Sequence, residues 1–81
     1  MSSEIDVTET LDVQGLNCPM PVVKTKQAVD DLAVGAVLEV VATDPGSMSD
    51  IAGWAQATDG VELVDQLDEG DTYRHLVRAT A

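Results

Sequence analysis

The sequence has a single cysteine, no phenylalanine, and only one tryptophan and one tyrosine among its 81 residues. One cysteine cannot close an internal disulfide, so the chain is not a disulfide-stapled secreted domain. With so few aromatic residues, the hydrophobic core must be built from valine, leucine, isoleucine, methionine and alanine. A chain of 81 residues supports one small core, which predicts one domain.

Basic residues are also scarce, with four lysines and arginines against fifteen acidic residues and a formal net charge of −11. This charge repels phosphate backbones and anionic membrane surfaces, which disfavours direct binding of nucleic acid or membrane. Concentrated salt screens repulsion between carboxylates, so the composition favours a halophilic source. The alternative is an acidic surface that matches a basic partner. The four basic residues are Lys24, Lys26, Arg74 and Arg78.

Long apolar runs are absent as well. The first residues, Met1 to Asp6, have neither the basic start nor the apolar run of a signal peptide, and no stretch approaches membrane-spanning length. A cytoplasmic location is therefore expected. Residues 1–8 are polar or acidic without a period, which predicts a flexible tail before a single domain at residues 9–81.

Hydrophobic periodicity predicts the element order β-α-β-α-β-β. The second strand has two largely apolar faces, which indicates a central position in the sheet. Residues Ser47 to Asp50 have the spacing of a helix capping box. The predicted elements are a strand at 10–14, a helix at 19–32, a strand at 37–43, a helix from Ser47, and a hairpin of strands at 61–67 and 72–80.

The expected fold is an α/β (α+β) two-layer sandwich, with both one-sided helices on one face of a four-stranded mixed sheet. On the first helix, Val22, Thr25, Ala28, Val29 and Leu32 should face the sheet. The other sheet face would be open to water or to a partner. An apolar patch of Val37, Val41, Val64 and Leu76 is expected there, and it would allow a weak homodimer as an alternative to a monomer.

Cys18 lies between Gly15 and Pro21, where the strand pattern gives way to the helix pattern. Pro19 and Pro21 suit the first turn of a helix, because a missing N–H group costs nothing there. A thiol next to a helix N-terminus meets the positive end of the dipole, so we expect a lowered pKa for Cys18 and a reactive thiolate. The alternative is a small buried side chain, which an exposed loop-to-helix corner disfavours.

Other catalytic arrangements find little support in the sequence. His75 falls inside a strand with no third orienting group, so we expect it to face solvent rather than to activate Cys18. One cysteine and one histidine cannot close a zinc site, and the acidic residues are scattered. The turn from Asp68 to Asp71 is expected to be solvated. The sequence therefore predicts neither a metal nor a cofactor.

The run from Leu11 to Pro21, a strand followed by Cys-Pro-x-Pro, resembles the signature of the TusA/SirA family of small sulfur-carrier proteins. Residues 43–45, Asp50-Ile51 with Trp54, and residues 73–78 resemble that family too, so the similarity covers residues 9–79. The resemblance implies a two-layer α/β sandwich like the C-terminal domain of bacterial translation initiation factor three. It makes Cys18 the persulfide-carrying cysteine, with Gly15, Pro19 and Pro21 as its supporting motif.

The implied function is that of a sulfur carrier. A cysteine desulfurase or rhodanese-like donor would pass sulfane sulfur to Cys18, and an acceptor sulfurtransferase would take it from the persulfide. The chain would then act as a stoichiometric relay rather than as an independent enzyme. Its scarcity of lysine and arginine departs from typical members and leaves the partners and the end product open. The alternative is a redox or interaction module that forms mixed disulfides through Cys18, with the resolving cysteine on another chain.

Overall fold

The computed structural model describes residues 6–81, so residues 1–5 of the expected tail lie outside the described residues. The order of elements is the predicted one. The elements are β1 (Glu9–Val13), α1 (Met20–Asp30), β2 (Val37–Ala42), α2 (Ser47–Ala57), β3 (Val61–Asp68) and β4 (Tyr73–Ala79). Neither helix has the length and hydrophobicity needed to cross a membrane.

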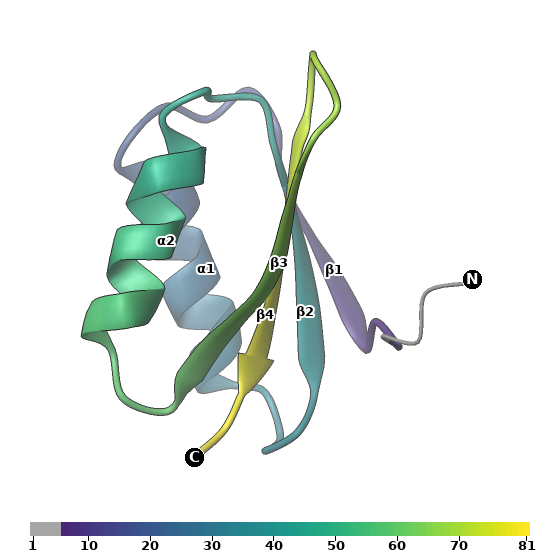
Figure 1. The fold of residues 1–81 in the computed structure, drawn as a ribbon, viewed down its shortest axis with the longest axis vertical. Coiled ribbons are helices and arrows are strands. Elements are labelled where there is room, and N and C mark those ends of the chain that lie inside the picture. The colour runs from purple at the N-terminus through teal and green to yellow at the C-terminus, as the bar shows by residue number, and fades with distance from the viewer. Residues whose placement is uncertain (1–5) are drawn as a thin grey trace.

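The four strands form one mixed sheet in the order β1-β2-β4-β3. β1 pairs parallel with β2, whereas β4 runs antiparallel to both of its neighbours, β2 and β3. Both helices cover the same face of the sheet, which gives two layers (Figure 1). Five of the six residues of β2 are buried, as expected of a central strand. The predicted fold class is confirmed.

The hydrophobic core lies between the helices and the sheet and consists mainly of aliphatic side chains. Its buried members are Val13, Val29, Leu38, Val40, Ala42, Ile51 and Val77. α1 contributes the predicted face, with Thr25 and Val29 buried one turn apart. The hydroxyl of buried Thr25 donates to the carbonyl of Pro21 at 2.7 Å, so this polar group is satisfied inside the core.

The open face of the sheet differs from the expectation of an exposed apolar patch. Val37, Val41 and Leu76 lie on this face but are only 4%, 6% and 9% exposed. The sheet register places Arg78 opposite Val37 and Arg74 opposite Val41, and long arginine stems cover apolar neighbours in this way. Val64, the fourth member of the predicted patch, is half-buried at an irregularity of the β3 register. The basis for a homodimer through this patch is therefore lost.

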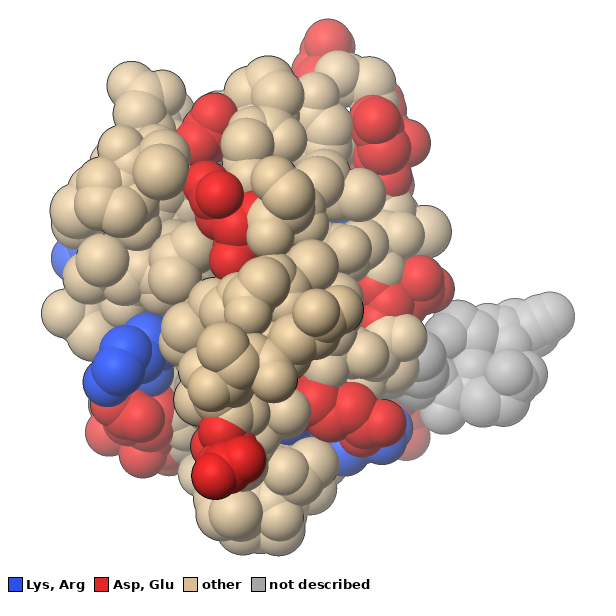
Figure 2. All heavy atoms as spheres, turned by 60° about the vertical axis from the view of Figure 1, so that its left-hand side comes forward, with Lys and Arg blue, Asp and Glu red and all other residues tan. Residues whose placement is uncertain are grey.

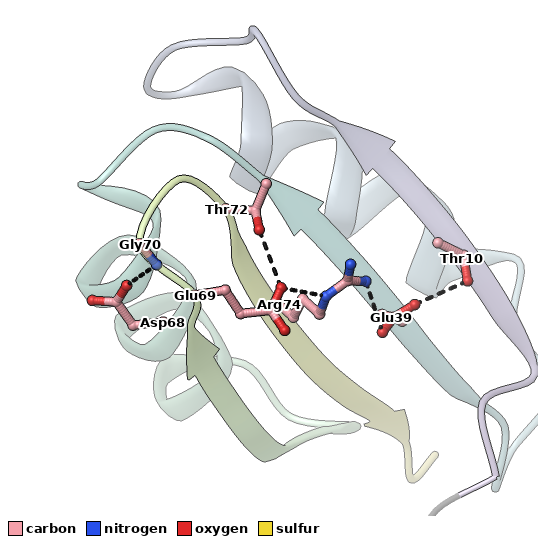
Figure 3. A network of polar contacts seen from close by, with 7 residues as sticks. All are labelled: Thr10, Glu39, Asp68, Glu69, Gly70, Thr72 and Arg74. Atoms are coloured by element: carbon pink, nitrogen blue, oxygen red, sulfur yellow. Dashed lines mark hydrogen bonds and ion pairs between the residues drawn. The ribbon is translucent and has the colours of Figure 1, made fainter.

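Ion pairs and hydrogen bonds cross this open face instead. Arg74 contacts the carboxylates of Glu39 at 3.3 Å and Glu69 at 2.8 Å, and Thr10 donates to Glu39 (Figure 3). This network lies across β1, β2 and β4 and extends to the hairpin turn. The face presents mainly charged groups to the solvent, with Leu67, paired with Arg74 and 44% exposed, as an apolar exception.

The predicted capping box at the start of α2 is wrong. Gly46 is the N-cap residue, and no side chain caps the helix. Ser47 is already helical, and its buried hydroxyl lies 3.1 Å from Nε2 of His75. Because this hydroxyl is engaged with the sheet, it does not accept from the first-turn N–H groups, as a capping serine would.

Candidate functional site

Cys18 is exposed in the loop that joins β1 to α1. Since β1 and β2 are parallel, their carboxyl ends lie at the same edge of the sheet. The β1–α1 and β2–α2 loops consequently run side by side at the end of the molecule where both helices begin (Figure 1). The fold thus brings Cys18 together with residues 43–50, which are 25 to 32 positions away in the sequence.

Two hydrogen bonds fasten the cysteine loop to the neighbouring loop. The N–H of Gly15 donates to Oγ1 of Thr43 at 2.8 Å, and the N–H of Cys18 donates to Oδ2 of Asp44 at 3.0 Å. Gly15 has a φ of +83°, in the left-handed region that favours glycine. These contacts hold the backbone on both sides of the turn that precedes α1.

The two prolines of the motif lie at the start of α1, as predicted. Pro19 is the N-cap residue, and the peptide bond between Cys18 and Pro19 is cis. Pro21 is the second residue of the helix and is buried. Proline fits both positions because the first N–H groups of a helix have no intrahelical partner. Cys18 therefore lies immediately before the N-cap residue of α1, and it is exposed.

The electrostatic environment of the thiol is opposite to the one expected. The pKa of Cys18 is raised above its ordinary value, first by a hydrogen bond with Asp50, then by partial desolvation and by the charges of Asp50 and Asp44. A carboxylate in contact with sulfur favours the protonated thiol. The expectation of a lowered pKa is wrong, because Asp50 and Asp44 both favour the protonated thiol.

Asp44 and Asp50 converge on Gly46, which lies between them in the sequence. Asp44 Oδ1 accepts from the N–H of Gly46 at 3.2 Å. A Cβ atom at Gly46 would lie 3.5 Å from Oδ2 of Asp50 and 3.6 Å from Oδ1 of Asp44. These are ordinary van der Waals distances, so both carboxylates lie close to one point beside the cysteine loop. Sequence analysis missed these two acids, although their place after a parallel strand puts them at the cysteine edge.

His75 does not face solvent, contrary to expectation, and is fully buried on β4. Its neighbours Arg74 and Leu76 take the open face, so strand alternation turns His75 toward the helices. Nε2 lies 3.1 Å from Oγ of Ser47, and Nδ1 lies 3.0 Å from the amide nitrogen of Gln66. That nitrogen can only donate, so Nδ1 accepts and Nε2 carries the proton. Both ring nitrogens are thereby engaged away from Cys18.

Charge and cavities complete the description of the surface. Acidic side chains are scattered over the side that carries the helices, and basic ones occupy much less of it (Figure 2). A cavity of about 210 Å³ lies near the ends of both helices, away from Cys18, and Leu32, Trp54 and Val61 contribute to its lining. Within residues 6–81, no group of three or more histidine, cysteine, aspartate or glutamate side chains is placed to hold a metal ion.

Comparison with known proteins gives consistent matches over the whole domain. The family model described as Sulfurtransferase TusA matches residues 9–79. A protein of the halophile Halobacterium salinarum is 68% identical over 80 residues, which is 99% of each chain. The Sulfur carrier protein TusA of Allochromatium vinosum is 40% identical over 73 residues, which is 90% of this chain and 95% of that protein.

A solved structure supports the fold independently. The crystal structure of a SirA-like protein from Desulfitobacterium hafniense superposes with a TM-score of 0.75 and covers 90% of this chain and 99% of that one. The two sequences are 24% identical. This likeness therefore concerns the architecture, with two helices on one face of a mixed sheet.

Proposed function

We propose, since this chain belongs to the TusA sulfurtransferase family, that it is a sulfur carrier whose Cys18 holds sulfane sulfur as a persulfide. The observation that carries this proposal is the placement of the only thiol of the chain. Cys18 is exposed at a corner that two backbone hydrogen bonds and two prolines hold in place. A thiol that must meet first a donor and then an acceptor needs such accessibility.

The chemistry requires only this thiol and two partner proteins. The Cys18 sulfur attacks the terminal sulfur of a donor persulfide, so a new S–S bond forms and the S–S bond of the donor breaks. The donor leaves as a thiolate, and the Cys18 thiol loses its proton. An acceptor thiolate then attacks the terminal sulfur on Cys18 in the same way. The chain thus returns to its starting state without a resolving cysteine of its own.

The donor in this scheme is a cysteine desulfurase or a rhodanese-like protein, and the acceptor is a sulfurtransferase. Both transfers take place in the cytoplasm, where thiols are kept reduced. Met20 and Val23, at the start of α1, are exposed apolar side chains close in sequence to Cys18. They give a docking partner an apolar contact beside the reactive sulfur.

Intact-mass spectrometry after incubation with polysulfide, or with a cysteine desulfurase and cysteine, tests this function. The wild-type chain should gain the mass of one sulfur atom, and a reducing agent should remove it. Cys18→Ser should gain nothing, whereas Asn17→Ser, which alters an exposed neighbour and keeps the thiol, should load normally. A gain that survives Cys18→Ser would contradict the proposal. A disulfide to a partner without any persulfide would support the mixed-disulfide module instead.

A further inference from the structure

Two carboxylates flank the Cys18 thiol, but they are engaged differently. Both oxygens of Asp44 accept backbone hydrogen bonds, one from Cys18 at 3.0 Å and one from Gly46 at 3.2 Å. Asp44 therefore shapes the loop. Asp50 lies in the first turn of α2, and its Oδ2 and the Oδ1 of Asp44 lie 3.5 and 3.6 Å from the position of a Cβ atom at Gly46. The carboxylate of Asp50 is therefore next to the loop that carries Cys18, where it raises the pKa of the thiol. The first turn of α1 contributes no acidic residue to the site.

The position of Asp50 is fixed by buried contacts behind it. Nε2 of His75 donates to the hydroxyl of Ser47, and the amide of Gln66 donates to the carbonyl of Met48 at 2.8 Å. These two bonds fasten the first turn of α2 to β3 and β4. The N–H of Asp50 donates to the carbonyl of Gly46 at 3.0 Å, and the next residue, Ile51, is fully buried. The carboxylate is thus presented to the thiol by a rigid helix end.

We propose that Asp50 is the catalytic proton acceptor and donor for Cys18 during sulfur transfer, an inference that rests on the proposed persulfide chemistry. During loading, the carboxylate of Asp50 takes the thiol proton while the Cys18 sulfur bonds to the terminal sulfur of the donor. The donor S–S bond breaks, and its electron pair stays on the donor thiolate. During discharge, the acceptor thiolate takes the terminal sulfur, and Asp50 returns the proton to the departing Cys18 sulfur.

This arrangement explains why acidic groups surround a nucleophile. The two carboxylates keep the resting thiol protonated, because they hold the pKa of Cys18 above its ordinary value. A protonated thiol attacks poorly unless a base removes its proton as the new bond forms. On discharge, a thiolate of raised pKa is a poor leaving group unless it is protonated. One carboxylate beside the sulfur meets both needs.

Single-turnover loading from polysulfide, followed by mass spectrometry across a range of pH, separates this role from simple electrostatics. Asp50→Asn removes the negative charge as well as the base. Electrostatics alone would then give more thiolate and faster loading at neutral pH. Loss of the base should instead slow loading by about tenfold, because the lowered pKa partly offsets the ~10²–10⁴-fold value of a general base. The difference in loading rate between Asp50→Asn and the wild-type chain should vanish at alkaline pH, where the thiolate reacts directly.

Asp44→Asn gives the opposite expectation, since it removes a charge and leaves the base in place, so loading at neutral pH should become faster. Asp59→Asn, beyond the far end of α2, is the matched surface control, and circular dichroism checks that each variant is folded. Faster or unchanged loading in Asp50→Asn, or equal slowing in Asp44→Asn, would overturn the inference while leaving the carrier function intact. No loading of the wild-type chain would instead refute the carrier function itself.

Discussion

The imidazole of His75 is buried and held in one neutral tautomer by Ser47 and Gln66. A second proton on the ring would set the donor of Gln66 against a new donor on Nδ1. Burial accordingly lowers the pKa of His75 below its ordinary value. These bonds also fix the start of α2, so the charge state of one ring bears on the geometry beside Cys18.

The stability of the protein should therefore fall in mildly acidic solution. In the unfolded chain His75 titrates near about pH 6.5, whereas in the folded chain it resists protonation to lower pH. The unfolded state thus binds the proton first, and stability present above about pH 6.5 is lost as the pH falls toward the folded pKa. Thermal melts between about pH 8 and about pH 5 should show this loss, and His75→Gln should flatten it.

Nuclear magnetic resonance gives a direct check, because His75 is the only histidine in the chain. An imidazole that titrates at or above its ordinary pKa would contradict the expectation. Glu69 is a second group whose protonation should lower the stability, and it acts at a lower pH than His75. The hydrogen bond from Arg74 holds the pKa of Glu69 below its ordinary value, so the stability that it contributes is lost only below about pH 4.3.

Single positions differ in how far sequence patterns determine them. Gly15, Cys18 and Pro19 lie in the loop before α1 and Pro21 lies in its first turn, and local rules for turns and helix starts predict these positions. His75 was misplaced because a lone histidine in a strand gives no indication of which face it takes. The two carboxylates at Cys18 come from a different loop, so their effect on the thiol depends on how the strands pair. Local patterns do not contain that information.

Among the elements, α2 joins the site to the core most directly. Asp50 and Ile51 are adjacent, the first against the thiol and the second fully buried. The helix was predicted correctly as an amphipathic element, but its capping was not. The spacing of Ser47 and Asp50 is typical of a capping box. In the folded domain, however, Ser47 contacts His75 and Asp50 lies beside Cys18. A local rule fails here because both of its residues have long-range partners.

Removing one methyl group from the buried side of α2 should destabilise the whole domain. Ile51→Val should lower the free energy of unfolding by about 0.5–1.5 kcal/mol, because the lost methyl leaves unfilled space in a packed core. Chemical denaturation followed by circular dichroism measures this change. Val34→Ala, at a side chain that is 67% exposed, is the control and should have little effect. Equal effects of the two substitutions would contradict the packing described for α2.

At the scale of the whole molecule, charge is the property most visible in composition. Three of the four basic residues make ion pairs in residues 6–81: Lys26 with Asp30, Arg74 with Glu39 and Glu69, and Arg78 with Glu62. Acidic residues still outnumber basic residues, fifteen to four, as the net charge of −11 requires. Composition predicts this surplus, whereas the pairing across the open sheet face depends on the strand register.

Salt should stabilise the folded chain. Added salt weakens surface ion pairs but also screens repulsion among the unpaired carboxylates. Because acids outnumber bases, screening should dominate, and the melting temperature should rise steadily between about 0.1 M and about 1 M potassium chloride. This fits the 68% identity to a protein of a halophile. A plateau at the lowest salt concentrations would instead favour the alternative of an acidic surface that matches a basic partner.

The irregularity between Leu63 and Asp65 interrupts the ladder of β3, which forms one edge of the sheet. An unpaired strand edge is a template on which a second molecule can add a strand and begin to aggregate. The carboxylates along β3 oppose this at low ionic strength, but concentrated salt shortens their reach to a few ångströms. The shape of the backbone at this irregularity, in contrast, does not depend on ionic strength. In concentrated salt, this local shape makes the β3 edge a poorer template for a second strand, even where charge no longer repels it.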